Sequence, residues 1–125
     1  MSHNALGRQF TQEDLAERHP DHYGDAEDLA WATGYLASGA SPGEDFDYDT
    51  NPVYRLGSVR TADLHPRVAY EGRVDSVRRG MREGTVPPIL VVKRGGEYLL
   101  ADGNHRATAA QRDGQRTMTA YIHEA

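Results

Sequence analysis

The residues with the clearest chemical potential lie together in the stretch ADGNHRA at residues 101–107. A carboxylate, an amide, an imidazole and a guanidinium surround a glycine, the residue that most readily takes a positive φ. The N–H groups that begin a helix attract anions, because they lack intrahelical partners and the helix dipole is positive there. An imidazole and a guanidinium at the same place suit a phosphate group. The stretch therefore predicts a phosphate site at Gly103, Asn104, His105 and Arg106.

The same residues also fit a plainer interpretation, an ordinary turn from a strand into a helix. Gly103 would then only supply the positive φ, and Asp102 or Asn104 would only cap the helix. Between the two roles open to Asp102, we favour capping over binding a magnesium ion. For His105 and Arg106 the residues alone leave open both contact with a phosphate and a purely structural role.

The neighbouring segments place this stretch between a strand and a helix. Two apolar runs of β type, at residues 87–94 and 97–100, are joined by Gly95-Gly96, which predicts a hairpin. Residues 106–113 are rich in Ala, Gln and Arg and are followed by Gly114, which is typical of a helix and its C-terminal end.

Other periodic segments complete a small α+β domain. A helix is predicted where Val74, Val77 and Met81 repeat at helical spacing. The order strand, helix, strand, strand, helix, strand over about seventy residues predicts a small mixed β-sheet packed with helices. In this order, the first strand is at 54–59, the first helix at 73–83 and the last strand at 116–122.

Charge divides the chain into an acidic front and a mildly basic remainder. Residues 1–51 hold 11 Asp and Glu against 2 Arg, a net charge of about −9, and the rest carries about +4, which gives the total of −5. Residues 40–51 are rich in Gly, Pro, Ser and acids and predict a loop. We therefore expect an acidic helical N-terminal extension and linker at 1–51, and a second domain at 52–125.

Two helices are predicted within the extension. The first, at residues 11–18, has Thr11 as its N-cap and Asp14 as a capping-box partner. The second, at 25–38, begins at Asp25 and stops at Gly39, with an apolar face made by Leu29, Ala32, Tyr35 and Leu36. Trp31 lies off that face, and we expect it to pack on the rest of the domain rather than on a partner.

Composition excludes several classes of function. The chain has no cysteine, which removes disulfides, thiolate metal sites and cysteine nucleophiles. His19 and His22 are separated by Pro20 and have no further ligand cluster nearby, so we predict no metal site. No apolar run approaches the roughly 20 residues that span a bilayer, and no signal pattern begins the chain. We expect a cytoplasmic protein without a membrane partner, and a net negative charge that disfavours tight non-specific binding of nucleic acid.

Three features in order resemble the ParB/sulfiredoxin superfamily, whose members include ParB-like nuclease domains. They are the helix at 73–83, the strand start at 86–89 (VPPI), and Asp-Gly-Asn-His-Arg at 102–106 followed by an Ala-rich helix. The resemblance covers about residues 55–122 and implies the sulfiredoxin fold. Small stand-alone proteins with this domain are frequent in phage genomes, so the resemblance also implies a possible phage source.

The sulfiredoxin pattern implies a nucleotide site. Its turn reads Gly-Cys-His-Arg, in which the His and Arg hold nucleotide phosphates, and His105 and Arg106 match them. Asn104 stands where the cysteine nucleophile stands, and an amide cannot do thiolate chemistry, so sulfinic-acid reduction is excluded. The family also uses a basic residue and a hydroxyl on the preceding helix, which Arg73 and Ser76 match, whereas a third contact would fall on Gly80.

Two other branches fit less closely. ParB proteins, which bind CTP, carry a Gly-Glu-Arg-Arg-like turn and a second arginine box that this chain lacks. Free-serine kinases of this fold have an Asp-Gly-His-His-Arg-like turn, which is closer to residues 102–106. Such a kinase needs a carboxylate base, and Glu71 or Asp63 could supply it.

Several functions therefore stay open. The first is binding of ATP or another nucleotide, with Mg²⁺, for phosphoryl transfer or nucleic-acid cleavage. His105 would be a phosphate ligand or general acid, Arg106 the charge clamp, and Asp102 a magnesium ligand or orienting group. The alternatives are a non-catalytic module that binds a nucleotide or nucleic acid, a protein-interaction module with a vestigial pocket, and a small-molecule kinase.

Overall fold

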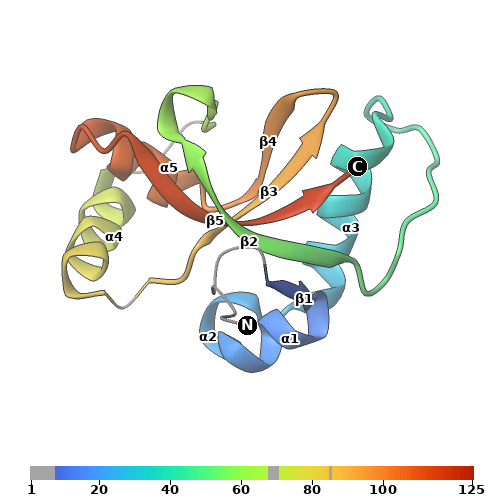
Figure 1. Ribbon diagram of the computed structural model, residues 1–125, viewed down its shortest axis with the longest axis horizontal. Coiled ribbons are helices and arrows are strands. Elements are labelled where there is room, and N and C mark those ends of the chain that lie inside the picture. The colour runs from blue at the N-terminus through green and yellow to red at the C-terminus, as the bar shows by residue number, and fades with distance from the viewer. Residues whose placement is uncertain (1–7, 68–70, 85) are drawn as a thin grey trace, which may run out of the picture.

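The computed structural model describes residues 8–67, 71–84 and 86–125, and in these residues a five-stranded sheet has the order β1-β2-β5-β3-β4 (Figure 1). Strands β3 and β5 are parallel and the other neighbours are antiparallel. The strands are β1 (Gln9–Thr11), β2 (Val53–Arg60), β3 (Ile89–Arg94), β4 (Glu97–Asp102) and β5 (Thr117–Glu124). The helices are α1 (Gln12–Arg18), α2 (Pro20–Tyr23), α3 (Ala26–Ser38), α4 (Glu71–Glu83) and α5 (Asn104–Arg112), with a 3-10 turn, η1, at Thr61–Asp63. The predicted α+β class and mixed sheet are confirmed.

Both faces of the sheet are covered, and β3 shows why its sequence is apolar without alternation. All four residues from Ile89 to Val92 are fully buried. Successive side chains of a strand point to opposite faces. Ile89 and Val91 accordingly join one core cluster with Ala107 of α5, while Leu90 joins a second cluster on the other face.

The N-terminal segment contributes to this second cluster. Strand β1 pairs with β2, and Phe10, Leu15 and Tyr23 pack with Tyr54 and Tyr121. The predicted capping box at the start of α1 is confirmed, since both of its hydrogen bonds are present. The division of the chain at residue 51 stays a prediction, and residues 1–7 lie outside the described part. The described part of the extension nevertheless shares one sheet and one core with the rest.

Helix α3 lies at one end of the sheet and α4 and α5 lie at the other (Figure 1). Helix α3 ends as predicted at Gly39, whose φ is +73°. Near this end, Arg94 Nη1 donates to the Leu36 carbonyl at 2.6 Å. Its buried residues are Ala30 and Thr33. The predicted apolar face is only half-buried, and Trp31 is 48 % exposed rather than packed in a core.

No helix in the described ranges is both long and apolar enough to cross a bilayer.

The turn from β4 into α5 depends on Gly103. Its φ of +108° favours glycine, and a Cβ there would lie 2.5 Å from Ile89 Cγ2 and 2.9 Å from Ile89 Cβ. Gly103 is also the N-cap residue of α5. The expectation that Asp102 or Asn104 caps this helix was wrong. Gly103 occupies the N-cap position, no side chain forms a cap hydrogen bond, and Asn104 is already the first residue of the helix.

We predict that Gly103→Ala lowers the free energy of unfolding by about 2–5 kcal/mol, since strain in the left-handed region adds to a clash in the core. Gly114→Ala is the matched control: its φ is +71° but nothing lies within 4 Å of its Cβ position. The control should lose only about 1–2 kcal/mol. Urea unfolding followed by circular dichroism measures both, and equal losses would contradict the steric argument.

Candidate nucleotide-binding cleft

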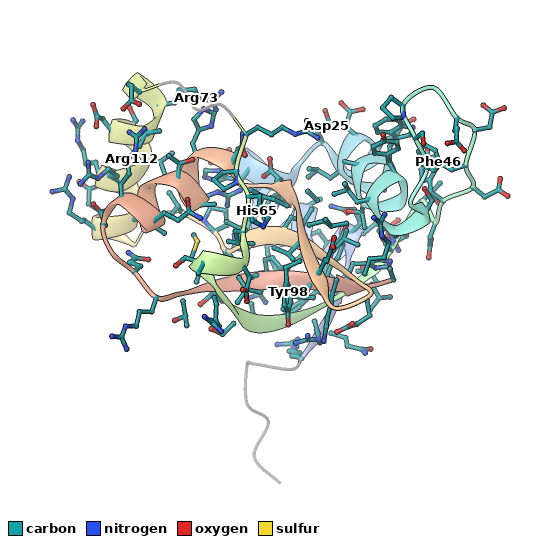
Figure 2. The ribbon with its side chains drawn as sticks, turned by 90° about the horizontal axis from the view of Figure 1, so that it is seen from above. Asp25, Phe46, His65, Arg73, Tyr98 and Arg112 are labelled. Atoms are coloured by element: carbon teal, nitrogen blue, oxygen red, sulfur yellow. The ribbon has the colours of Figure 1, made fainter. Side chains whose placement is uncertain are left out.

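A cleft of about 1220 Å³ follows the edge strand β4, with α3 on one side and α4 and the start of α5 on the other. Figure 2 shows Arg73 on the α4 side, Phe46 on the α3 side and His65 between them. The chain therefore brings residues of the extension and of the second predicted domain to one opening. Among the described residues, the basic and imidazole side chains that line this opening are His22, His65, Arg67, Arg73, His105 and Arg106.

The predicted turn lies at this cleft. Gly103, Asn104 and His105 all line it, and His105 is half-buried. The helix begins with the bond from Ala107 N–H to the Gly103 carbonyl at 2.8 Å. The first N–H groups of a helix have no intrahelical acceptor. The positive end of the α5 dipole therefore faces a space large enough for a ligand.

Asn104 holds the segment that carries His65 and Arg67 beside this turn. Its Oδ1 accepts the Arg67 N–H at 2.5 Å, and Gln111 Nε2 donates to the Leu64 carbonyl at 3.1 Å. These two bonds fix the segment that carries His65 and Arg67 into the cleft. Neither residue was predicted as part of the site, because a single His-Pro-Arg in a loop matches no motif and its position depends on contacts 37 and 47 residues away.

Arg106 lies at the turn, but its guanidinium points into the protein. The side chain is 8 % exposed, and its Nη2 donates to Asp102 Oδ2 at 2.8 Å. Its Nη1 lies 3.0 Å from Tyr23 Oη, 2.9 Å from the Pro87 carbonyl and 3.1 Å from the Pro88 carbonyl. The predicted role as a clamp on a phosphate is not supported by this geometry, because the protein's own acceptors occupy the fork.

The tyrosine in this arrangement is neutral. Burial raises the pKa of Tyr23 to about 12, so its hydroxyl keeps its proton, which it donates to the Pro88 carbonyl. The neighbouring His19 has a pKa below its ordinary value, mainly because of burial. Its Nε2 lies 2.9 Å from Tyr121 Oη. The buried Arg106 guanidinium is thus bordered by the protonated Tyr23 hydroxyl and paired with the Asp102 carboxylate.

Of the two ligand contacts predicted on α4, Arg73 and Ser76, only Arg73 lies at the cleft. Ser76 lies outside it, and its Oγ donates to the Gly72 carbonyl at 3.1 Å. The ligand role of Ser76 stays a prediction that the geometry does not favour.

The carboxylates that could serve as a base are placed elsewhere. Glu71 forms a two-pronged ion pair with Arg112, whose hydrogen bond lowers the pKa of Glu71. Neither Glu71 nor Asp63 lines the cleft. Within the described residues, no group of three His, Cys, Asp or Glu side chains could hold a metal ion.

The opposite wall of the cleft is aromatic. Trp31 and Tyr35 stack with centroids 5.5 Å apart and planes at 1°, and Phe46 lies 5.4 Å from Trp31 and 5.5 Å from Tyr35. We call Trp31, Tyr35 and Phe46 the aromatic wall. Acidic side chains also line the cleft, at Glu44 and Asp45 beside Phe46 and at Asp21 of α2.

Solved structures resemble the chain over slightly more than half its length. Sulfiredoxin from Arabidopsis thaliana is 21 % identical with a TM-score of 0.50, and the match covers 56 % of this chain and 85 % of that one. This likeness supports the fold alone.

Two structures of C-terminally truncated chromosome-partitioning protein ParB from Caulobacter crescentus are also similar. One, complexed with CTP-gamma-S, is 28 % identical with a TM-score of 0.47, covering 56 % of this chain and 44 % of that one. The other, complexed to the centromeric parS site, is 25 % identical with a TM-score of 0.42, covering 54 % and 38 %. The chain thus spans less than half of those ParB chains.

No curated protein sequence matches the chain. The family model of the ParB N-terminal domain matches residues 56–125, which is more than half of the chain and includes β3, β4, α5 and β5. The chain belongs to the ParB N-terminal domain family.

Proposed function

We propose that this protein binds a nucleotide, with the phosphates at the turn formed by Gly103, Asn104 and His105. The observation that carries the proposal is that basic side chains from separate elements line the cleft at which α5 begins. Arg73 comes from α4, and His65 and Arg67 come from the loop that Asn104 and Gln111 hold in place. A phosphate there would meet N–H donors, a helix dipole and flexible cations together.

The size of the cleft supports a ligand larger than inorganic phosphate. Ligand pockets commonly enclose about 300–1,000 Å³, and this cleft reaches about 1220 Å³. Family membership makes a nucleotide the first such ligand to test, with ATP and CTP as the candidates. Mg²⁺ is commonly held by one or two carboxylates together with substrate phosphates. Asp102, which lines the cleft while its Oδ2 accepts from Arg106, is the carboxylate at the turn that would join such an ion.

The positioning of the polar groups favours binding over turnover. Asn104, in place of a nucleophile, has its amide oxygen engaged by Arg67. Glu71, a candidate base from the sequence, is engaged by Arg112 and lies outside the cleft. In this proposal Arg106 does not touch the ligand. It is a positioning residue that holds the turn from behind.

We predict that ATP or CTP raises the melting temperature, because a ligand at 100 times its Kd adds about 2.7 kcal/mol to stability. Arg73→Gln and His105→Gln should each weaken binding about three- to tenfold by removing one charged or polar phosphate contact. Arg79→Gln is the matched control, since Arg79 is exposed on the same helix but does not line the cleft. Thermal shift and calorimetry measure these effects. If ATP, CTP and pyrophosphate all fail to bind the wild type, the proposal is wrong.

A second hypothesis is that the site also hydrolyses the nucleotide. What favours it is that His105 and Asp102 both line the cleft beside the turn. A water oxygen would attack the terminal phosphorus while the bond to the bridging oxygen breaks, and His105 would accept the water proton. Cleavage of a nucleic-acid phosphodiester would follow the same pattern.

We expect His105→Ala to lower any phosphate release from ATP or CTP by about 10²-fold or more, as loss of a general base does. The assay measures released phosphate with Mg²⁺ present, and nicking of a plasmid in parallel. A wild type that binds nucleotide yet releases no phosphate and nicks no DNA would identify a binding module and reject turnover.

A further inference from the structure

We infer that the aromatic wall of Trp31, Tyr35 and Phe46 receives the base of the nucleotide. This inference rests on the proposed function and adds a second subsite, built by the N-terminal segment outside the region that the family model matches. The ligand would lie across the cleft, with its phosphates at the α5 turn and its base on α3 and the loop that follows.

The wall is exposed where a ligand can reach it. Trp31 lines the cleft and is 48 % exposed, although two further aromatic rings lie within 5.5 Å of its centroid. Tryptophan is large and mostly buried in proteins on average. An indole that is supported from inside and open toward a cleft has the properties of a stacking platform.

The wall is also held in place before any ligand arrives. A Cβ on Gly34 would lie 2.2 Å from Tyr48 Cβ, so the absence of a side chain lets the loop pack directly on α3. Phe46 lies 5.8 Å from Tyr48 within that loop. The end of α3 is tied to β3 by the bond from Arg94 to the Leu36 carbonyl. A preorganised surface loses less entropy on binding than one that must form.

Charge sets the direction in which a nucleotide can lie. Glu44 and Asp45 line the cleft beside Phe46 of the wall, whereas Arg73 and His105 come from α4 and α5, and α2 contributes both Asp21 and His22. Carboxylates repel phosphates but accept hydrogen bonds from the amino groups of bases. The phosphates are therefore expected at the α5 turn, and the flat, uncharged base at the wall.

The chain carries its own probe for this test, because Trp31 is its only tryptophan. Titration of the full-length protein with ATP or CTP is expected to quench Trp31 fluorescence, since the base stacks on the indole. Inorganic triphosphate, which has no base, is expected to bind and leave the fluorescence unchanged. Adenosine and cytidine, which have no phosphate, are expected to quench it weakly at high concentration.

Variants measured by calorimetry separate stacking from indirect effects. Trp31→Leu should weaken ATP and CTP binding about tenfold, within the range found for a lost base–aromatic stack, and leave triphosphate affinity unchanged. Trp31→Phe keeps a ring and should recover part of the loss. Tyr98→Leu is the matched control, a half-buried aromatic residue of β4 outside the cleft lining, and should not change binding. Circular dichroism verifies that each variant is folded.

The outcomes distinguish this inference from the proposed function. If nucleotide and triphosphate bind equally well and Trp31 does not respond, the phosphate site stands and the base subsite is refuted. If nucleosides quench Trp31 while triphosphate does not bind, the base subsite stands and the phosphate site is refuted. If none of these ligands binds, both are refuted.

Discussion

One buried guanidinium connects the parts of this fold that form the cleft. Arg106, at the start of α5, reaches Tyr23 of the extension, the carbonyls of Pro87 and Pro88 before β3, and Asp102 at the end of β4. A buried charge is strongly destabilising unless its partners are complete. The three segments must therefore meet in one arrangement. The same bonds fix the turn that opens toward the ligand.

This arrangement divides the positive charge of the site into two sets. The guanidinium of Arg106 points into the protein and stabilises the turn. The cations that line the cleft are Arg73 of α4 and Arg67 of the segment that Asn104 holds. Arg67 and Arg73 are exposed and neither forms an ion pair with another described residue, so their side chains can turn toward a phosphate. A cation saturated by internal carbonyls would have to leave them in order to bind a ligand, at a large cost in stability.

The sequence was most informative where local rules decide the structure. The hairpin follows from Gly95-Gly96 between two β-type runs, and the positive φ at Gly103 follows from its place between a strand and a helix. The direction of Arg106 could not be predicted, because its partner Tyr23 lies 83 residues away. The aromatic wall was missed for a similar reason: Trp31 lies off the apolar stripe of α3, and only the return of the loop beside Gly34 shows what it faces.

The N-terminal extension forms part of the cleft, in addition to carrying negative charge. Its acidity alone could have served solubility, but Asp21, Glu44 and Asp45 line the same cleft as the basic residues of the second half. Strand β1, Tyr23 and the aromatic wall all belong to it. A nucleotide that bridges the cleft would touch both halves, and each half would bind only part of it. Ligand affinity and the docking of the extension are then linked, since whatever loosens one half from the other removes one of the two subsites.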